Sequence, residues 1–150
     1  MHPLTVLYAR LKEPGFTWVI TGSLGMALQG MDLDVHDIDL QSSREGVYAI
    51  QALFPELVTR PVELRQSETI RSFFGAMQIG VITIELMGDM QKRTAGGSWT
   101  EPPDLDRLTR RVDYAGMRLP VLDLEYEHRS YLEMGRVEKA GRIRRFLDGL

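Results

Sequence analysis

The sequence lacks cysteine altogether, which excludes disulfide bonds, thiolate nucleophiles and thiolate metal sites. This absence is typical of proteins of a reducing cytoplasm, where we expect this one to work. No stretch approaches the roughly 20 apolar residues of a membrane span, and the first residues lack the charged start and apolar centre of a signal peptide. What is present is the composition of a folded protein: 150 residues, 43% hydrophobic and 26% charged.

The net charge of −3 gives the chain no overall attraction for nucleic acid, so long nucleic acid is disfavoured as a partner. The charges are nevertheless unevenly placed. Acidic residues gather at Asp32, Asp34, Asp37 and Asp39, and basic residues gather at Arg136, Lys139, Arg142, Arg144 and Arg145. A basic stretch of this kind is typical of a solvated helix face, so the acidic group is the more informative of the two.

Hydrophobic periodicity predicts an α/β protein in which helices flank a small mixed β-sheet. Helical spacing favours helices over 3–12, 123–134 and 136–148, a short helix with Ser23 as its N-cap and Gly30 at its end, and a helix between a Ser42–Glu45 capping box and Pro55. Strands are predicted at 16–21, 37–40, 57–64, 70–79, 81–87, 110–114 and 117–121, with a loop over 91–106. We expect one domain over 1–150, with 123–150 as a C-terminal helical tail.

Asp37 and Asp39 are two positions apart in a predicted strand, so their carboxylates project from the same face while Ile38 and Leu40 face the core. Neighbouring carboxylates repel each other, and burying them together is costly without a compensating cation or shared proton. A hard divalent cation such as Mg²⁺ provides this compensation. The pair predicts a metal site, although an Asp-x-Asp alone is common.

Glu85 is a charged residue in the middle of an otherwise apolar strand, Val81–Met87. Ile82, Ile84 and Leu86 share one face, which leaves Glu85 on the other. The carboxylate lies either on the solvated face of an edge strand or beside the Asp-x-Asp pair. In the second arrangement three carboxylates converge, as a two-metal site for displacement at phosphorus requires.

Gly22 and Ser23 follow a buried strand and open a helix. Glycine lets a phosphate approach the backbone closely, and the serine hydroxyl can donate to a phosphate oxygen. A plain helix N-cap is the alternative interpretation of this pair.

The order of these features is more specific than any one of them. The segments VITGSLGMALQG, DIDLQ and IELM resemble the nucleotidyltransferase superfamily, which includes DNA polymerase beta and the small bacterial antibiotic- and toxin-modifying transferases. The pattern of that family is Gly-Ser, a short spacer, Asp-x-Asp and a third carboxylate on a later strand. Two positions depart from it, because Glu85 stands where Asp is commoner and His36 precedes Asp37 where many relatives carry a small or hydroxyl residue.

The resemblance implies that Gly22 and Ser23 hold a nucleoside triphosphate, most readily ATP, and that Asp37 and Asp39 bind two Mg²⁺ ions. It also implies that Glu85 helps to bind one of these ions and activates the incoming hydroxyl group. A looser resemblance covers the C-terminal tail. It implies that its basic residues contact phosphates or a partner, namely Arg136, Lys139 and Arg142.

Several interpretations stay open at this point. Residues 21–25 followed by acidic residues resemble an incomplete dinucleotide-binding fingerprint, and Asp37 with Asp39 also fits an aspartyl phosphatase. A catalytically idle member of the same fold that binds a partner protein, such as an antitoxin, is the main alternative to an enzyme. The acceptor of a transferred nucleotide is open between a small molecule, a protein hydroxyl and a nucleic-acid end, of which long nucleic acid is the least favoured. A second subunit or partner protein could complete its pocket.

Overall fold

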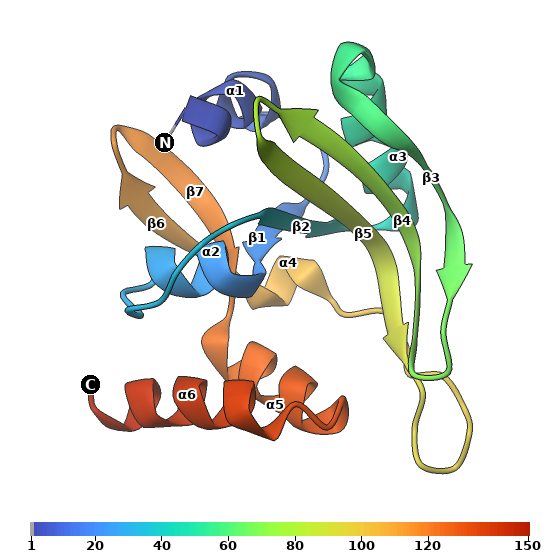
Figure 1. Cartoon of the computed structure of the whole chain (residues 1–150), viewed down its shortest axis with the longest axis vertical. Helices are drawn as coiled ribbons and strands as arrows, with labels where there is room; N and C mark the ends of the chain where they lie inside the picture. Colours follow the sequence, from blue (N-terminus) through green and yellow to red (C-terminus); the bar gives the residue numbers. More distant parts are fainter. Residues whose placement is uncertain (1) are drawn as a thin grey trace.

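The computed structural model describes residues 2–150. Within this range, seven strands form one mixed sheet in the order β3-β4-β5-β2-β1-β7-β6 (Figure 1). The strands are β1 (Trp18–Thr21), β2 (Ile38–Ser42), β3 (Val58–Gln66), β4 (Ile70–Ile79), β5 (Ile82–Lys92), β6 (Thr109–Tyr114) and β7 (Met117–Leu122). The helices are α1 (His2–Leu11), α2 (Gly22–Leu28), α3 (Arg44–Leu53), the 3₁₀ turn η1 (Pro55–Leu57), α4 (Leu105–Leu108), α5 (Leu124–Glu133) and α6 (Val137–Asp148). The predicted α/β class, mixed sheet and C-terminal helices are confirmed.

The sheet mixes both kinds of pairing. Strands β1 and β2, β3 and β4, β4 and β5, and β6 and β7 are antiparallel, whereas β2 and β5, and β1 and β7, are parallel. A dinucleotide-binding domain needs an open, mostly parallel sheet in which the first strands are linked by parallel crossovers. Because β1 and β2 are antiparallel neighbours, the sheet excludes the dinucleotide-binding alternative.

The main core covers one face of the sheet. Ile38 and Leu40 of β2 and Ile84 and Leu86 of β5 are at most 1% exposed. They pack with inward residues of α1 and α3, namely Leu4, Leu7, Leu11, Val47 and Ile50. Since strand side chains alternate between faces, the residues between these four face the other side of the sheet, as the period of two predicts.

A second apolar cluster docks the C-terminal helices onto α2. Met26 of α2 packs with Leu124 and Tyr131 of α5 and with Ala140 and Ile143 of α6. The helix pair α5–α6 lies below α2, at the bottom of Figure 1. Apolar burial of this kind, at about 25 cal/mol per Å², fixes α5 next to the residues that follow β1. None of the helices within residues 2–150 is both long and apolar enough to cross a membrane.

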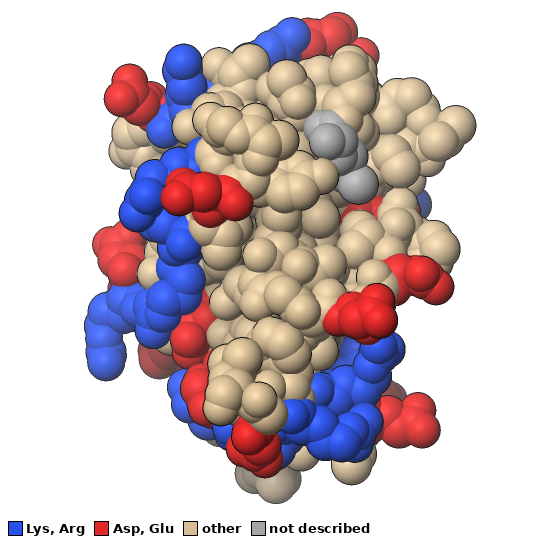
Figure 2. Space-filling view, turned by 90° about the vertical axis from the view of Figure 1, so that its left-hand side faces the viewer, with Lys and Arg blue, Asp and Glu red and all other residues tan. Residues whose placement is uncertain are grey.

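The basic residues of α6 are partly paired with acids. Arg144 donates to both carboxylate oxygens of Glu125 at 3.0 and 3.2 Å and to Asp148 at 3.1 Å. Figure 2 shows Lys and Arg side chains at the lower end of one face, mixed with acidic and uncharged residues. This mixed pattern is that of a solvated helix face.

The helix after β2 begins one residue later than predicted. Ser43 is the N-cap of α3, and its hydroxyl accepts a hydrogen bond from the Gly46 N–H at 2.9 Å. Ser42 is the last residue of β2 and donates its hydroxyl to the Thr17 carbonyl. The predicted capping box at Ser42 is therefore wrong, because the strand takes that residue for its own pairing with β1 and β5.

Strand β5 is longer than predicted and contains a β-bulge. It runs to Lys92, into the predicted loop over 91–106, which is also shortened by α4 at its other end. Arg71 pairs with Gln91 and Phe73 with Gly88, so two steps along β4 oppose three along β5. Asp89 has φ 46°, a left-handed conformation that suits the extra residue. The bulge resets the alternation of side chains, so Met90 and Lys92 lie on the face that carries Glu85.

Candidate active site

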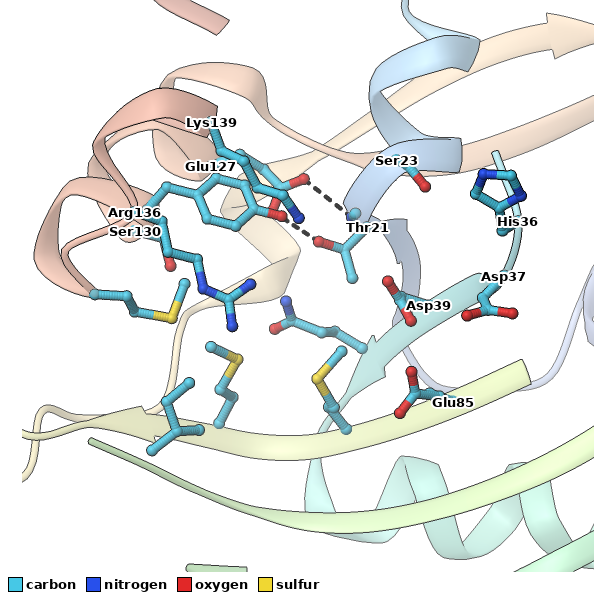
Figure 3. A pocket seen from close by; sticks show the side chains of 17 residues that line it. Thr21, Ser23, His36, Asp37, Asp39, Glu85, Glu127, Ser130, Arg136 and Lys139 are labelled. Atoms are coloured by element: carbon cyan, nitrogen blue, oxygen red, sulfur yellow. Dashed lines mark hydrogen bonds between the residues drawn. The ribbon is translucent and has the colours of Figure 1, made fainter. Parts of the chain in front are cut away.

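The carboxylates of Asp39 and Glu85 lie side by side because β2 and β5 pair in parallel. Asp39 is the register partner of Glu85, and Gln41 is the partner of Met87. Asp37 immediately precedes β2 and is exposed. Figure 3 shows the three carboxylates on one side of the two strands. The predicted placement of Glu85 beside the Asp-x-Asp pair is therefore found in the structure.

A cavity of about 410 Å³ opens over these acids, between the sheet and the helix pair α5–α6. This volume is within the range of about 300–1,000 Å³ that small-molecule sites occupy. Seven of the eight predicted site residues line the cavity: Gly22, Ser23, Asp37, Asp39, Glu85, Arg136 and Lys139. His36, to which the sequence assigned no role, also lines it. Residues as far apart in the sequence as Thr21 and Lys139 thus line one site.

The backbone of Gly22 lies directly against the carboxylate of Asp39. Thr21 is the N-cap of α2, two residues before the predicted cap at Ser23, so that prediction is wrong. Gly22 has φ +66°, and a Cβ added to it would overlap Oδ2 of Asp39 and lie 3.3 Å from its Cγ. The position requires glycine for both reasons: the left-handed backbone and the carboxylate packed on its Cα.

Burial and neighbouring charge both raise the pKa of Asp39. Its removal from water is the largest cause, the Glu85 and Asp37 carboxylates add to it, and the Lys139 ammonium acts in the opposite direction. Together these effects raise the pKa of Asp39 to about 6. The acids therefore hold more negative charge than the protein itself compensates, which is the condition that favours binding of a cation.

A divalent cation fits these acids best as part of a complex with phosphate. Within residues 2–150, no three His, Asp or Glu side chains are placed to hold an ion by themselves. Mg²⁺ usually takes one or two carboxylates and completes its shell with waters and substrate phosphate oxygens. Asp37, Asp39 and Glu85 could therefore contribute ligands to an ion whose remaining ligands are waters and phosphate oxygens.

The basic residues of the tail divide between two places. Arg136, at the start of α6, and Lys139 line the cavity, with the Lys139 ammonium 5.4 Å from the centre of the Tyr131 ring. Arg142 lies outside this lining, and its guanidinium donates to the Asp32 carbonyl at 3.1 Å. The structure therefore brings only Arg136 and Lys139 to the site.

Glu127 is a residue of the cavity that the sequence patterns did not predict as part of the site. It lies on α5, is 5% exposed and lines the cavity. Burial raises its pKa to about 7, although hydrogen bonds from Thr21 and Gly22 lower it. A signal was present in the sequence: Glu127 occupies the inward face of the helix between Leu124 and Tyr131, where an apolar residue is expected.

One part of the cavity wall is apolar. It is formed by Ile70 of β4, Met87 and Met90 of β5, and Met134, the C-cap of α5. Met90 reaches this wall because of the bulge at Asp89, which turns it to the same side as Met87. Thioether side chains are flexible and polarizable, so such a wall can adapt to a flat or apolar part of a ligand.

The fold and the site together define a nucleotidyltransferase. The order of strand, Gly-Ser, helix and Asp-x-Asp, with a third acid on a parallel neighbouring strand, is found in three dimensions as well as in sequence. Residues 3–143 match the family model of the aminoglycoside-2''-adenylyltransferases, and the chain belongs to this family. It is thus an enzyme of the transferase class, as the sequence predicts.

Solved structures place the chain in the same group. A Thermotoga maritima protein provisionally described as a nucleotidyltransferase is 46% identical, with a TM-score of 0.87 over 99% of this chain and 92% of that one. ANT(2'')-Ia, in complex with adenylyl-2''-tobramycin, is 14% identical, with a TM-score of 0.61 over 98% of this chain and 90% of its own. The lincosamide adenylyltransferase LnuA, with lincomycin bound, is 14% identical, with a TM-score of 0.50 over 84% and 80% of the two chains. The last two show a shared fold alone, and no curated protein sequence matches.

Proposed function

We propose that this protein transfers a nucleoside monophosphate from ATP, with two Mg²⁺ ions, to a hydroxyl group of a small molecule. The observation that carries the proposal is the pairing of Asp39 with Glu85 beneath Gly22, inside a cavity of ligand size. The adenylyl product and the antibiotic named in the two distant structures support an adenine nucleotide and a small acceptor. The absence of cysteine and the use of ATP both suit a cytoplasmic protein.

The reaction is an in-line displacement at the α-phosphorus. Glu85 accepts the proton of the acceptor hydroxyl, whose oxygen forms the new bond to phosphorus as the bond to pyrophosphate breaks. Ser23 donates its hydroxyl to a phosphate oxygen, and Arg136 with Lys139 balances the charge of the triphosphate. When bound, Mg²⁺ supplies positive charge to the attacking and leaving oxygens. Asp37 and Asp39 would hold it.

Calorimetric titration of ATP into the protein tests this proposal. We expect binding in the presence of Mg²⁺ and an affinity weaker by about tenfold or more in EDTA, because the carboxylates repel the triphosphate without a cation. Pyrophosphate release would then be followed with candidate acceptors, starting with tobramycin and lincomycin, the compounds in the distant structures. Absence of binding for ATP, GTP, CTP and UTP would contradict the proposal and favour a partner-binding protein.

The metal-dependent affinity for ATP is expected to fall below about pH 6. The pKa of Asp39 is raised to about 6, so acid protonates the carboxylate that would bind the cation. Each pH unit below this value should weaken binding about tenfold, and binding should level off above it. Titrations at pH 5 to 8 in two buffers of different ionisation enthalpy would show the proton released near pH 6. A protein-free titration of ATP with Mg²⁺ corrects for protonation of the nucleotide.

A further inference from the structure

Both carboxylate oxygens of Glu127 accept hydrogen bonds from the Thr21–Gly22 turn, which lies against Asp39. Its Oε1 accepts a hydrogen bond from the Thr21 hydroxyl at 2.8 Å, and its Oε2 accepts one from the Gly22 N–H at 3.2 Å (Figure 3). These contacts join α5 to the end of β1 across 106 and 105 positions of the chain. The Gly22 N–H thus already donates to a group of the protein. Gly22 therefore contributes to the site through where its backbone lies, against Asp39.

The position of Gly22 controls the position of Asp39. The Asp39 carboxylate packs against the Gly22 Cα so closely that a side chain there would overlap it. A displacement of the Gly22 backbone therefore removes the surface on which this carboxylate rests. The two hydrogen bonds from Thr21 and Gly22 to Glu127 are what ties this backbone to the C-terminal helices.

Helix α5 is itself held to the strand that carries Glu85. Lys92 of β5 is 6% exposed, and its ammonium group donates to the Ser130 hydroxyl and to the Glu133 carboxylate, each at 3.2 Å. The helix therefore contacts both strands that lead to the acids: β1 through Glu127 and β5 through Lys92. Lys92 is buried whereas the Glu133 side chain is exposed, so the restraint comes from the ammonium group, whose charge would be left uncompensated if its partners were lost.

We propose that Glu127 is a positioning residue, which fixes the Thr21–Gly22 turn and through it the carboxylate of Asp39, so that α5 sets the geometry of the metal site. The inference rests on the proposed function, since it assigns Asp39 to the metal. The raised pKa of Glu127, about 7, shows that its burial is unfavourable for the ionised form. A costly buried carboxyl in a cleft is a frequent mark of function.

Substitution of Glu127 by glutamine separates positioning from proton transfer. The carboxamide introduced by E127Q can accept from the Gly22 N–H and donate to the Thr21 oxygen, so this variant keeps both hydrogen bonds, whereas it cannot take up a proton. E127A removes both bonds, and T21V removes one while keeping a β-branched residue in the strand. Glu125→Gln is the matched control, since Glu125 lies on the same helix, is exposed and is paired with Arg144 outside the cavity.

Two measurements read out the effect: exchange of the Gly22 amide proton by NMR, and calorimetric affinity for ATP with Mg²⁺. We expect E127Q to retain ATP affinity within about threefold and E127A to lose about tenfold or more. T21V should fall between them, and T21V/E127A should be no worse than E127A, because both changes break the same link. The Gly22 amide should exchange slowly in the wild type and E127Q and much faster in E127A.

An E127Q protein as defective as E127A would overturn the proposal in favour of a charge or proton role. Wild-type affinity and slow Gly22 exchange in E127A would also overturn it. If E127A does not fold, T21V decides, and unchanged affinity and exchange in T21V count against the proposal. If the wild type binds no ATP, the proposed function fails, while faster Gly22 exchange in E127A or T21V still identifies the link to Glu127.

Discussion

Asp39→Asn is expected to abolish metal-dependent ATP binding and transfer while leaving the protein folded and at least as stable. The carboxamide has nearly the same shape as the carboxylate, so the contact with Gly22 is kept. It lacks the negative charge that a cation requires, and loss of a direct ligand should exceed the ~10–100-fold effect of losing an outer-shell partner. Pyrophosphate release and calorimetry would measure this loss.

The stability of Asp39→Asn tests whether the ionised Asp39 side chain opposes folding. The pKa of Asp39 is raised from 3.8 to about 6 in the folded protein, so its stabilising contribution is present below about pH 4 and is lost as the pH rises through 6. At pH 7.5 the ionised side chain therefore opposes folding, by about 1–3 kcal/mol. A neutral Asn removes this cost, and thermal unfolding without metal should occur at the wild-type temperature or above.

Asp34→Asn is the matched control, because Asp34 is an exposed acid of the loop that leads into β2, outside the cavity lining. It changes the net charge by the same amount and should leave ATP affinity within about twofold. Asp39→Asn with ATP affinity and pyrophosphate release close to the wild type would contradict the assigned metal site. A much less stable Asp39→Asn protein would contradict the unfavourable charge at this position.

Gly22→Ala is expected to weaken ATP binding by about 100-fold or more, a larger effect than its loss of stability would explain. The left-handed backbone at φ +66° costs an alanine about 1–2 kcal/mol. The added methyl group also overlaps the Asp39 carboxylate, which must move out of line with Glu85. Misplacement of a reacting group by about 1 Å can cost about 100-fold.

Gly80→Ala separates these two effects. Gly80 joins β4 to β5 with φ +60°, and a Cβ added there meets no atom within 4 Å. The variant therefore carries similar backbone strain without a clash. Denaturant unfolding should show a similar loss of stability for both variants, while calorimetry should show lost ATP affinity for Gly22→Ala alone. Equal ATP affinity in the two variants would mean that the contact between Gly22 and Asp39 is unimportant.

The acidic pair could be predicted because its evidence is local. A period of two places Asp37 and Asp39 on one face, and the same rule isolates Glu85 on the polar face of its strand. The parallel register that joins β2 to β5 does not follow from this rule. The sequence allowed Glu85 to lie either on the solvated face of an edge strand or beside Asp37 and Asp39. Only the resemblance to the nucleotidyltransferases favoured the second arrangement, which the structure shows.

The remaining features depend on contacts between distant segments. The spacing of Glu127 from Leu124 and Tyr131 marks it as an inward-facing acid, but its hydrogen-bond partners follow only from the docking of α5 over the end of β1. The bulge at Asp89 could not be predicted, because the pair Gly88-Asp89 is also typical of the start of a loop. Ser42 and Ser43 are adjacent and equally suited to cap a helix, and tertiary pairing of β2 decides between them. Local propensity cannot supply such information.

The link between Glu127 and Thr21 also has a consequence for how the protein is made. A ribosome releases the chain from its N-terminus, at about 5–20 residues per second. The Gly-Ser turn and the acids therefore leave the ribosome several seconds before the helix that covers them, since the bond to Thr21 spans 106 positions. During that interval the nascent chain has its carboxylates but lacks the wall of the cavity that α5 and α6 form. Nucleotide could then support folding only after α5 and α6 have left the ribosome.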